Sequence, residues 1–158
     1  MCPLPSTALE PLDMTCSTGA SLSLTIKTMS EDAVLAYNAG HANSNDFVAV
    51  EVRGGQPRLL LDQGNGVSEL WHDANVSDGQ WHKITTVFRS DRLEISVDGN
   101  NKFSAPNKGT NKHIDLTDRL FIGGMELKKK TRAIRKAFKT NALSDAMNIS
   151  NYCFLFPV

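Results

Sequence analysis

The chain has 158 residues, of which 41% are hydrophobic and 22% are charged, and its 17 Lys and Arg balance its 17 Asp and Glu. This length suits one domain that buries roughly two-thirds of the surface of its unfolded chain. No stretch reaches the about 20 apolar residues that cross a bilayer as a helix. Three cysteines, Cys2, Cys16 and Cys153, are too few for a disulfide scaffold, form no CxxC metal pair and leave at least one thiol without an internal partner.

The neutral total hides an uneven distribution of charge. Residues 1–127 carry ten Lys and Arg against sixteen Asp and Glu, whereas residues 128–139 carry seven basic residues and no acid. We therefore expect an acidic body with a basic segment attached to it.

The first twenty residues are rich in Pro, Ser and Thr, and they predict an irregular leader ahead of a single domain over residues 21–158. They show no basic region followed by an apolar one, so no signal peptide is visible. If the protein is secreted, we expect this chain to be a piece of a longer one.

From residue 21 onward the pattern is that of β-strands. Leu22, Leu24 and Ile26 alternate with polar residues, as a half-buried strand requires. Further short runs, each bounded by turn residues, predict strands at residues 34–37, 47–52, 58–61, 70–71, 81–88, 92–98 and 120–122. Because no convincing helix precedes residue 125, the pattern indicates an all-β, two-sheet antiparallel β-sandwich.

The clearest local signal is a hairpin that begins with the turn Asp78-Gly79. The run at residues 81–88 is rich in aromatic and β-branched residues, and a polar turn separates it from a strictly alternating strand. That alternation predicts that Leu93, Ile95 and Val97 face a core.

The sequence Asp-Gly-Gln-Trp-His at residues 78–82, followed by a strand and by Leu-Glu-Ile-Ser-Val-Asp-Gly at 93–99, resembles the signature of laminin G-like domains. The resemblance extends over residues 21–124 and ends at Gly123-Gly124. It implies a jelly-roll, concanavalin-like sandwich of a laminin alpha-like or related matrix or guidance protein. Such a module is secreted, lies in the extracellular matrix and acts in cell adhesion.

The same resemblance implies a calcium site. Carboxylates of Asp46 and Asp115 fall on the positions of the family's acidic ligands, and backbone carbonyls of Gln63 and His113 fall on its remaining protein ligands. Calcium takes six to eight oxygen ligands, so such a set leaves positions for water or for a sugar oxygen. The alternative is that both aspartates are ordinary turn residues, which Asp favours through local hydrogen bonds.

The basic segment predicts an affinity for polyanions, since adjacent cations create a high local potential. Its cations are Lys128, Lys129, Lys130, Arg132, Arg135, Lys136 and Lys139. Resemblance points to heparan sulfate or a receptor-borne acidic glycan, and to cell-surface receptors. Nucleic acid is disfavoured because the body is acidic and no aromatic residues interleave the basic run. The alternatives are a solvated loop or surface helix without a partner, or a processing site.

Two Asn-x-Ser triplets, beginning at Asn75 and Asn148, are N-glycosylation acceptors if the chain enters the secretory pathway.

An enzyme is disfavoured. The nearest carboxylate pair, Glu94 and Asp98, belongs to the outward face of its strand, and no Gly-x-Ser-x-Gly nucleophile turn is present. No zinc spacing links the histidines, which are His41, His72, His82 and His113. We expect Trp71 and Trp81 to pack in the core or hairpin and not to form a sugar platform.

The ending at residues 125–158 is atypical for the family. Ala142 stands where the family has a cysteine, so Cys153 lacks its usual partner, and the apolar tail 152–158 either docks as an edge strand or promotes association. Besides a glycan- or receptor-binding module, two hypotheses stay open. One is a structural or self-association module without a ligand site, and the other is a domain that binds a lipophilic, steroid-like ligand between its sheets.

Overall fold

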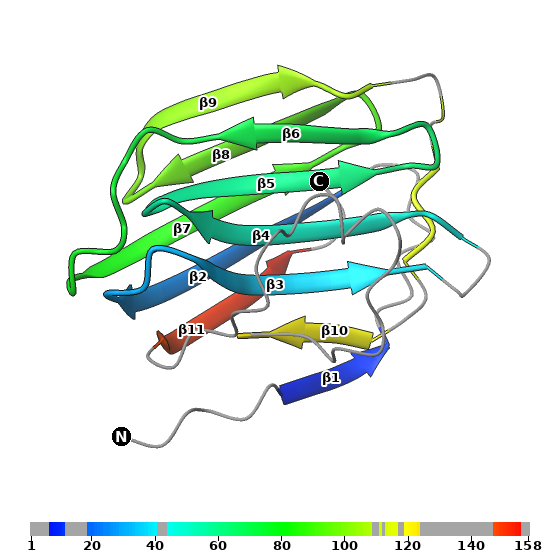
Figure 1. The fold of residues 1–158 in the computed structure, drawn as a ribbon. Coiled ribbons are helices and arrows are strands. Elements are labelled where there is room, and N and C mark those ends of the chain that lie inside the picture. Colours follow the sequence, from blue (N-terminus) through cyan, green and yellow to red (C-terminus); the bar gives the residue numbers. More distant parts are fainter. Residues whose placement is uncertain are drawn as a thin grey trace.

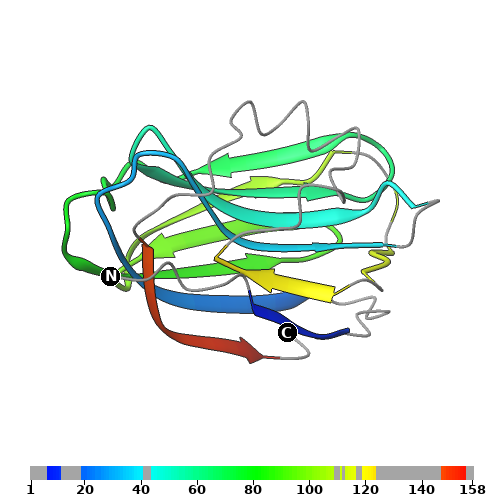
Figure 2. The same ribbon diagram turned by 60° about the horizontal axis from the view of Figure 1, so that its bottom comes forward.

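The computed structural model describes residues 7–11, 19–40, 44–108, 111, 113–116, 119–123 and 147–155. Over these residues the regular elements are all β-strands, arranged as two antiparallel sheets that face each other (Figures 1 and 2). Within the same part of the chain, no helix is long and apolar enough to span a membrane. The two-sheet antiparallel sandwich predicted from the sequence is confirmed.

One layer is a six-stranded sheet in the order β1-β10-β3-β4-β5-β6. Its strands are β1 (Thr7–Pro11), β10 (Arg119–Ile122), β3 (Ala33–Ala39), β4 (Phe47–Arg53), β5 (Gln56–Asp62) and β6 (Val67–Trp71). The other layer is a five-stranded sheet in the order β11-β2-β7-β8-β9. Its strands are β11 (Met147–Leu155), β2 (Ala20–Thr28), β7 (Trp81–Phe88), β8 (Arg92–Val97) and β9 (Asn100–Pro106).

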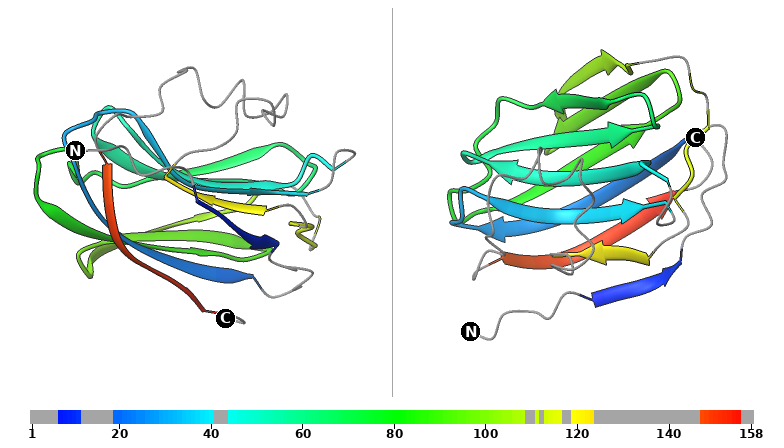
Figure 3. Two further views of the ribbon diagram at one scale, coloured as in Figure 1. Left: turned by 90° about the horizontal axis from the view of Figure 1, so that it is seen from below. Right: turned by 45° about the vertical axis from the view of Figure 1, so that its right-hand side comes forward.

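Successive strands run in opposite directions from β2 to β10, so their connections gather at two rims (Figure 1). The connections β3–β4, β5–β6, β7–β8 and β9–β10 lie at one rim, which we call the β3–β4 rim. The connections β2–β3, β4–β5, β6–β7 and β8–β9 lie at the opposite rim, which we call the β6–β7 rim. The two layers are seen edge-on in Figure 3.

The core lies between the sheets. Leu93, Ile95 and Val97 of β8 are at most 4% exposed and belong to it, as their alternation predicts. From β4 it takes Val48, Val50 and Val52, whereas Phe47 and Ala49, on the opposite face of the strand, belong to a second buried cluster. That cluster draws only on the six-stranded sheet, so it lies on the outer face of that sheet.

The structure corrects the expected leader and adds a strand. Thr7–Pro11, expected to be irregular, forms β1 and pairs with β10, and Asn100–Pro106 forms the unpredicted β9. Both are edge strands. Within β9 only Phe103 and Ala105 are partly buried, and the other residues are exposed. The alternation of apolar and polar residues is therefore too short to predict this strand.

Residues 152–155, the described part of the apolar tail, belong to an edge strand, which was one of the two outcomes left open. β11 pairs with β2, and Cys153 lies opposite Ser23 in the register. Cys2 and Cys16 lie outside the described residues, as does the whole basic segment at 128–139. The glycan contacts of that segment therefore remain a prediction.

Candidate metal centre

Asp46 and Asp115 meet at the β3–β4 rim. The backbone N–H of Asp115 donates a hydrogen bond of 2.8 Å to Oδ2 of Asp46. Asp46 immediately precedes β4, and Asp115 lies in the connection from β9 to β10. The two acids that sequence reasoning selected from distant parts of the chain are thus brought into contact.

The loop before Asp46 holds this carboxylate in place. Its backbone N–H donates to Oγ of Ser44 at 3.1 Å, and its carbonyl accepts from the N–H of Gly40 at 2.9 Å. A Cβ added at Gly40 would lie 2.6 Å from both the Asp115 carbonyl oxygen and Ser44 Oγ. Only glycine therefore allows this approach of the two loops.

Gln63 and His113 lie at the same rim and are linked through Asn111. The Asn111 Nδ2 donates to the carbonyl oxygen of Gln63 at 2.8 Å, and its Oδ1 accepts from the backbone N–H of His113 at 3.2 Å. The turn at Gly64 packs against the first acid, since a Cβ built there would lie 3.5 Å from Oδ1 of Asp46. Sequence reasoning missed Asn111, because only the folded chain shows what its amide joins.

A third acid, Asp62, also lies here and was not predicted. It ends β5, is 5% exposed, and its Oδ1 accepts hydrogen bonds from the N–H groups of Gly64 at 2.8 Å and Gly66 at 3.1 Å. The Asp-x-Gly-x-Gly spacing is a local turn signal that could have identified it.

Three carboxylates gather at this rim, and their charges affect one another. The pKa of Asp46 is raised, chiefly by burial and also by the neighbouring carboxylates of Asp115 and Asp62. The hydrogen bond from the backbone of Asp115 opposes this increase but does not cancel it. Among the described residues, no Lys or Arg forms an ion pair with these three acids. Oδ1 of Asp115 is buried and has no hydrogen-bond partner.

This set of carboxylate and carbonyl oxygens suits a hard cation. Across the described ranges, no group of three His, Cys, Asp or Glu side chains lies close enough to hold an ion. Two carboxylates supplemented by carbonyl oxygens are instead the ligands that Ca²⁺ accepts. A carbonyl oxygen has two lone pairs, so the bond from Asn111 leaves one lone pair on Gln63.

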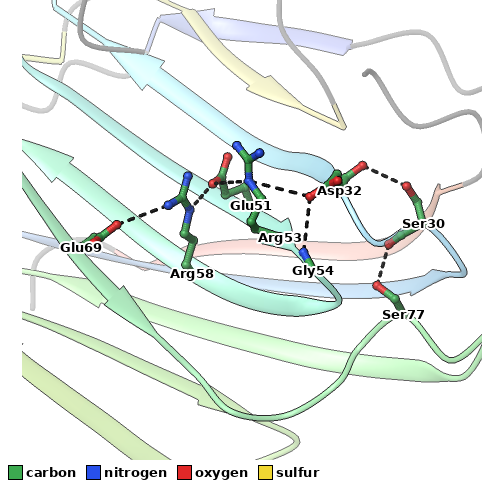
Figure 4. A network of polar contacts seen from close by, with 8 residues as sticks. All are labelled: Ser30, Asp32, Glu51, Arg53, Gly54, Arg58, Glu69 and Ser77. Atoms are coloured by element: carbon green, nitrogen blue, oxygen red, sulfur yellow. Dashed lines mark hydrogen bonds and ion pairs between the residues drawn. The ribbon is translucent and has the colours of Figure 1, made fainter. Parts of the chain in front are cut away.

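A second polar cluster extends from the outer face of the six-stranded sheet to the β6–β7 rim (Figure 4). Glu51 pairs with Arg58, which also contacts Glu69 at 3.3 Å, while Arg53 lies 3.7 Å from both Glu51 and Asp32. Burial raises the pKa of Glu51 to about 7, against the opposing effect of the two guanidinium groups. Because Arg58 bridges the two glutamates, this cluster ties strands together and offers no free acid–base pair.

The carboxylate pair weighed for catalysis is not a pair in the structure. Lys102 contacts Glu94 at 2.7 Å, and its hydrogen bond holds the pKa of Glu94 below its usual value. Oδ2 of Asp98 instead bonds Nδ1 of His82 at 2.8 Å. Each acid is therefore occupied by its own cationic or histidine partner.

The two predicted acceptors of N-linked glycans lie in different settings. Asn75 is exposed in the β6–β7 connection, where its Oδ1 accepts from the N–H of Ser77 at 2.9 Å. Asn148 lies within β11, opposite Lys27.

The tryptophans were expected to be packed, and this expectation is wrong for Trp81, which is 49% exposed. Trp71 is 36% exposed, and the Arg58 guanidinium lies 4.8 Å from its ring centroid. Odd-numbered positions of β7 face away from the core, so Trp81 points outward despite its apolar character.

A cavity of about 10 Å³ lies beside Leu22, Asn38, Phe88 and Leu120. Both amide atoms of Asn38 are buried there without a hydrogen-bond partner. The volume of this cavity matches one water molecule. The hypothesis of a lipophilic ligand between the sheets stays a prediction.

Comparison with known proteins places the chain in a family. A family model described as Laminin G domain matches residues 26–140. Human laminin subunit alpha-1 is 28% identical over 114 residues, covering 72% of this chain and 4% of that protein. Human chondroitin sulfate proteoglycan 4 is 32% identical over 106 residues, covering 67% of this chain and 4% of that protein. The chain thus spans a small part of the relatives that it matches.

Solved structures show the same fold. The mouse laminin alpha1 chain, domains LG4-5, superposes with a TM-score of 0.79 at 23% identity, over 94% of this chain and 39% of that one. The LG1-3 region of the laminin alpha2 chain gives a TM-score of 0.75 at 23% identity, over 94% of this chain and 30% of that one. The family match, which covers most of the sequence, and the shared sandwich lead to one conclusion: this chain belongs to the laminin G domain family.

Proposed function

We propose that this domain is an extracellular binding module that recognises acidic glycans, or receptors that carry them, with the help of a calcium ion at the β3–β4 rim. The observation that carries the proposal is the contact of Asp46 with Asp115, where a buried carboxylate oxygen lacks a partner. The family is a binding module and not an enzyme, in keeping with the occupied carboxylates of Glu94 and Asp98.

Each residue of the rim has a part in holding the ion. The carboxylates of Asp46 and Asp115 and the carbonyls of Gln63 and His113 are the protein ligands. Asp62 adds negative potential, and Asn111 positions the two carbonyl-bearing segments through its hydrogen bonds. Bound calcium would offer its remaining positions to a hydroxyl or carboxylate oxygen of a sugar.

The basic segment at 128–139 adds long-range attraction for the same class of ligand. Its seven cations would raise the local concentration of a sulfated or carboxylated polysaccharide, and this effect weakens with salt. One similar protein is, by name, the mouse basement membrane-specific heparan sulfate proteoglycan core protein, 26% identical over 102 residues that cover 63% of this chain and 3% of that protein. We propose a secreted, matrix location for this chain as well.

A structural or self-association role is the second candidate. β11 and β9 are the edges of the five-stranded sheet, and edge strands present backbone groups that pair with another chain. Concentration-dependent dimerisation without ligand, measured by analytical ultracentrifugation, would support that role.

The main proposal is tested by binding a panel of acidic glycans with calcium and with chelator. We expect binding that calcium strengthens and that Asp46→Asn with Asp115→Asn weakens. The matched control is Asp73→Asn, an exposed acid at the opposite rim. Equal binding with calcium and chelator would remove the metal from the proposal, and no binding to any acidic glycan would remove the function.

A further inference from the structure

The outer face of the five-stranded sheet carries an exposed tryptophan beside two lysines. Ile84, Thr86 and Phe88 of β7 point inward, so Trp81 and Lys83 project from the opposite face. On β2, Leu24 and Ile26 belong to the core, so Lys27 also projects outward. These three side chains therefore share one surface.

Register places the three side chains close together. Lys27 lies directly opposite Trp81 on the neighbouring strand, and directly opposite residues have Cβ atoms about 4.5–5.5 Å apart. Lys83 follows Trp81 by two residues, which is about 6.5 Å along the same face. Eight consecutive β2–β7 pairs, from Ala20↔Phe88 to Lys27↔Trp81, show no register shift, so the surface is continuous.

Within the described part of the chain, neither lysine has an ionic partner. Among the ion pairs of the described residues, none involves Lys27 or Lys83, whereas Lys102 and Arg92 on the same sheet are held by Glu94. Asp98, whose Oδ1 accepts a hydrogen bond from the backbone N–H of Lys83, and Asp78 are both engaged by the imidazole of His82, at 2.8 and 3.0 Å.

Hydroxyl groups continue this surface along the strands. Oγ of Ser23 and Oγ1 of Thr85 are 3.0 Å apart, and Ser96 lies opposite Thr85 on β8. Thr25 lies opposite Lys83. Hydroxyls both donate and accept hydrogen bonds, so they suit the hydroxyls of a sugar chain.

We propose that this face is a second saccharide site, which binds an anionic sugar with one ring stacked on Trp81 and its carboxylate or sulfate held by Lys27 and Lys83. An exposed indole offers a flat apolar surface with a polar edge. The paired ammonium groups supply the complementary charge. The site does not depend on the calcium proposal, because Trp81 opens β7 at the β6–β7 rim, and Asp46 lies at the other end of the sandwich (Figure 1).

The test uses the fact that the chain has two tryptophans. Trp71→Phe leaves Trp81 as the reporter, and Trp81→Phe leaves Trp71. A sulfated disaccharide is titrated into each variant in chelator, with fluorescence and calorimetry as readouts. We expect saturable fluorescence change in Trp71→Phe and none in Trp81→Phe, with about tenfold weaker binding in Trp81→Ala.

Charge is tested separately with Lys27→Gln and Lys83→Gln, against Lys102→Gln as the matched paired lysine on the same sheet. We expect the first two to weaken binding and reduce its salt dependence, and the third to change neither. A neutral disaccharide, with neither sulfate nor carboxylate, should not bind. No fluorescence change in Trp71→Phe, or equal affinity in Trp81→Ala, would overturn the site, as would a signal that appears only with calcium. Failure of the calcium proposal would instead appear as loss of the calcium effect, with this chelator-resistant binding intact.

Discussion

The backbone amide of Asp115 and the Oδ2 of Asp46 are joined by a 2.8 Å hydrogen bond, although the residues are 69 positions apart. This bond uses one oxygen of Asp46, while Oδ1 of Asp115 stays buried without a partner. The rim thus has a fixed backbone arrangement and an unsatisfied carboxylate, a combination that favours a cation bound by oxygen ligands.

Calcium is expected to stabilise the fold through this pair. For a dissociation constant of order 10⁻⁴–10⁻³ M, 10 mM calcium adds about 1.4–2.7 kcal/mol to the free energy of unfolding. Thermal unfolding with calcium and with chelator measures this gain. It should vanish in the Asp46→Asn, Asp115→Asn double variant and persist in Asp73→Asn. Identical melting curves for the unsubstituted chain would show that the rim holds no calcium.

Gly40→Ala is expected to disturb the rim. The added methyl group would lie 2.6 Å from the Asp115 carbonyl oxygen, so the loops must separate. We expect a loss of about 1–3 kcal/mol and a weaker effect of calcium. Gly99→Ala is the comparison. A Cβ at this position would contact no other atom, so the substitution brings only the backbone strain of a φ of +75°. Chemical denaturation with and without calcium separates the two, and an unchanged calcium effect in Gly40→Ala would contradict the expected rearrangement.

The cluster of Asp78, His82 and Asp98 is expected to make stability depend on pH. Burial lowers the pKa of His82. Its hydrogen bonds to Asp98 and Asp78, together with the charges of these two acids, more than offset this effect, so the pKa is raised overall. The contribution of His82 is therefore complete below its unfolded pKa and is lost as pH rises through its folded pKa.

The two acids act in the opposite sense. The N–H of Gln80 and the His82 ring lower the pKa of Asp78. Burial raises the pKa of Asp98, but the hydrogen bonds from His82 and from the N–H of Lys83, together with the charge of His82, bring it below its usual value. Their contribution is lost as pH falls through these lowered values, so the cluster stabilises most between about pH 4 and 6.5. Urea unfolding of the unsubstituted chain and of His82→Gln should differ at pH 6 and converge by pH 9. The exposed His113→Gln serves as control, and a constant difference across this range would refute the linkage.

Ile84→Ala is expected to reduce stability strongly, whereas Trp81→Ala is expected to reduce sugar binding with little loss of stability. Ile84 is 1% exposed, so its truncation leaves a cavity and costs about 2–5 kcal/mol. Trp81 faces solvent three residues earlier, and its truncation should cost under about 1 kcal/mol while removing the proposed sugar contact. Unfolding in urea measures both. A large loss in Trp81→Ala would indicate a packing role and weaken its use as a binding variant.

Local pattern accounts for most of the sandwich. Alternation at Leu22, Leu24 and Ile26, and again at Leu93, Ile95 and Val97, determines which face of each strand is buried, since side chains alternate at every residue. β1 and β9 escaped prediction because they are edge strands, where a hydrophobic pattern gives little guide.

Some site residues could be selected from the sequence, and others were found only in the folded chain. Asp46 and Asp115 could be selected from the sequence only through family resemblance, because each by itself reads as a turn residue. Their contact, the bridging role of Asn111 and the proximity of Asp62 follow from strand order, which brings alternate connections to one rim. The exposure of Trp81 likewise depends on register, since the same residue one position along would face the core. The sequence by itself determined the strands and their buried faces, because these depend on a period of two residues. Only the tertiary structure decided which distant oxygens and cations lie together, because that depends on the order and register of the strands.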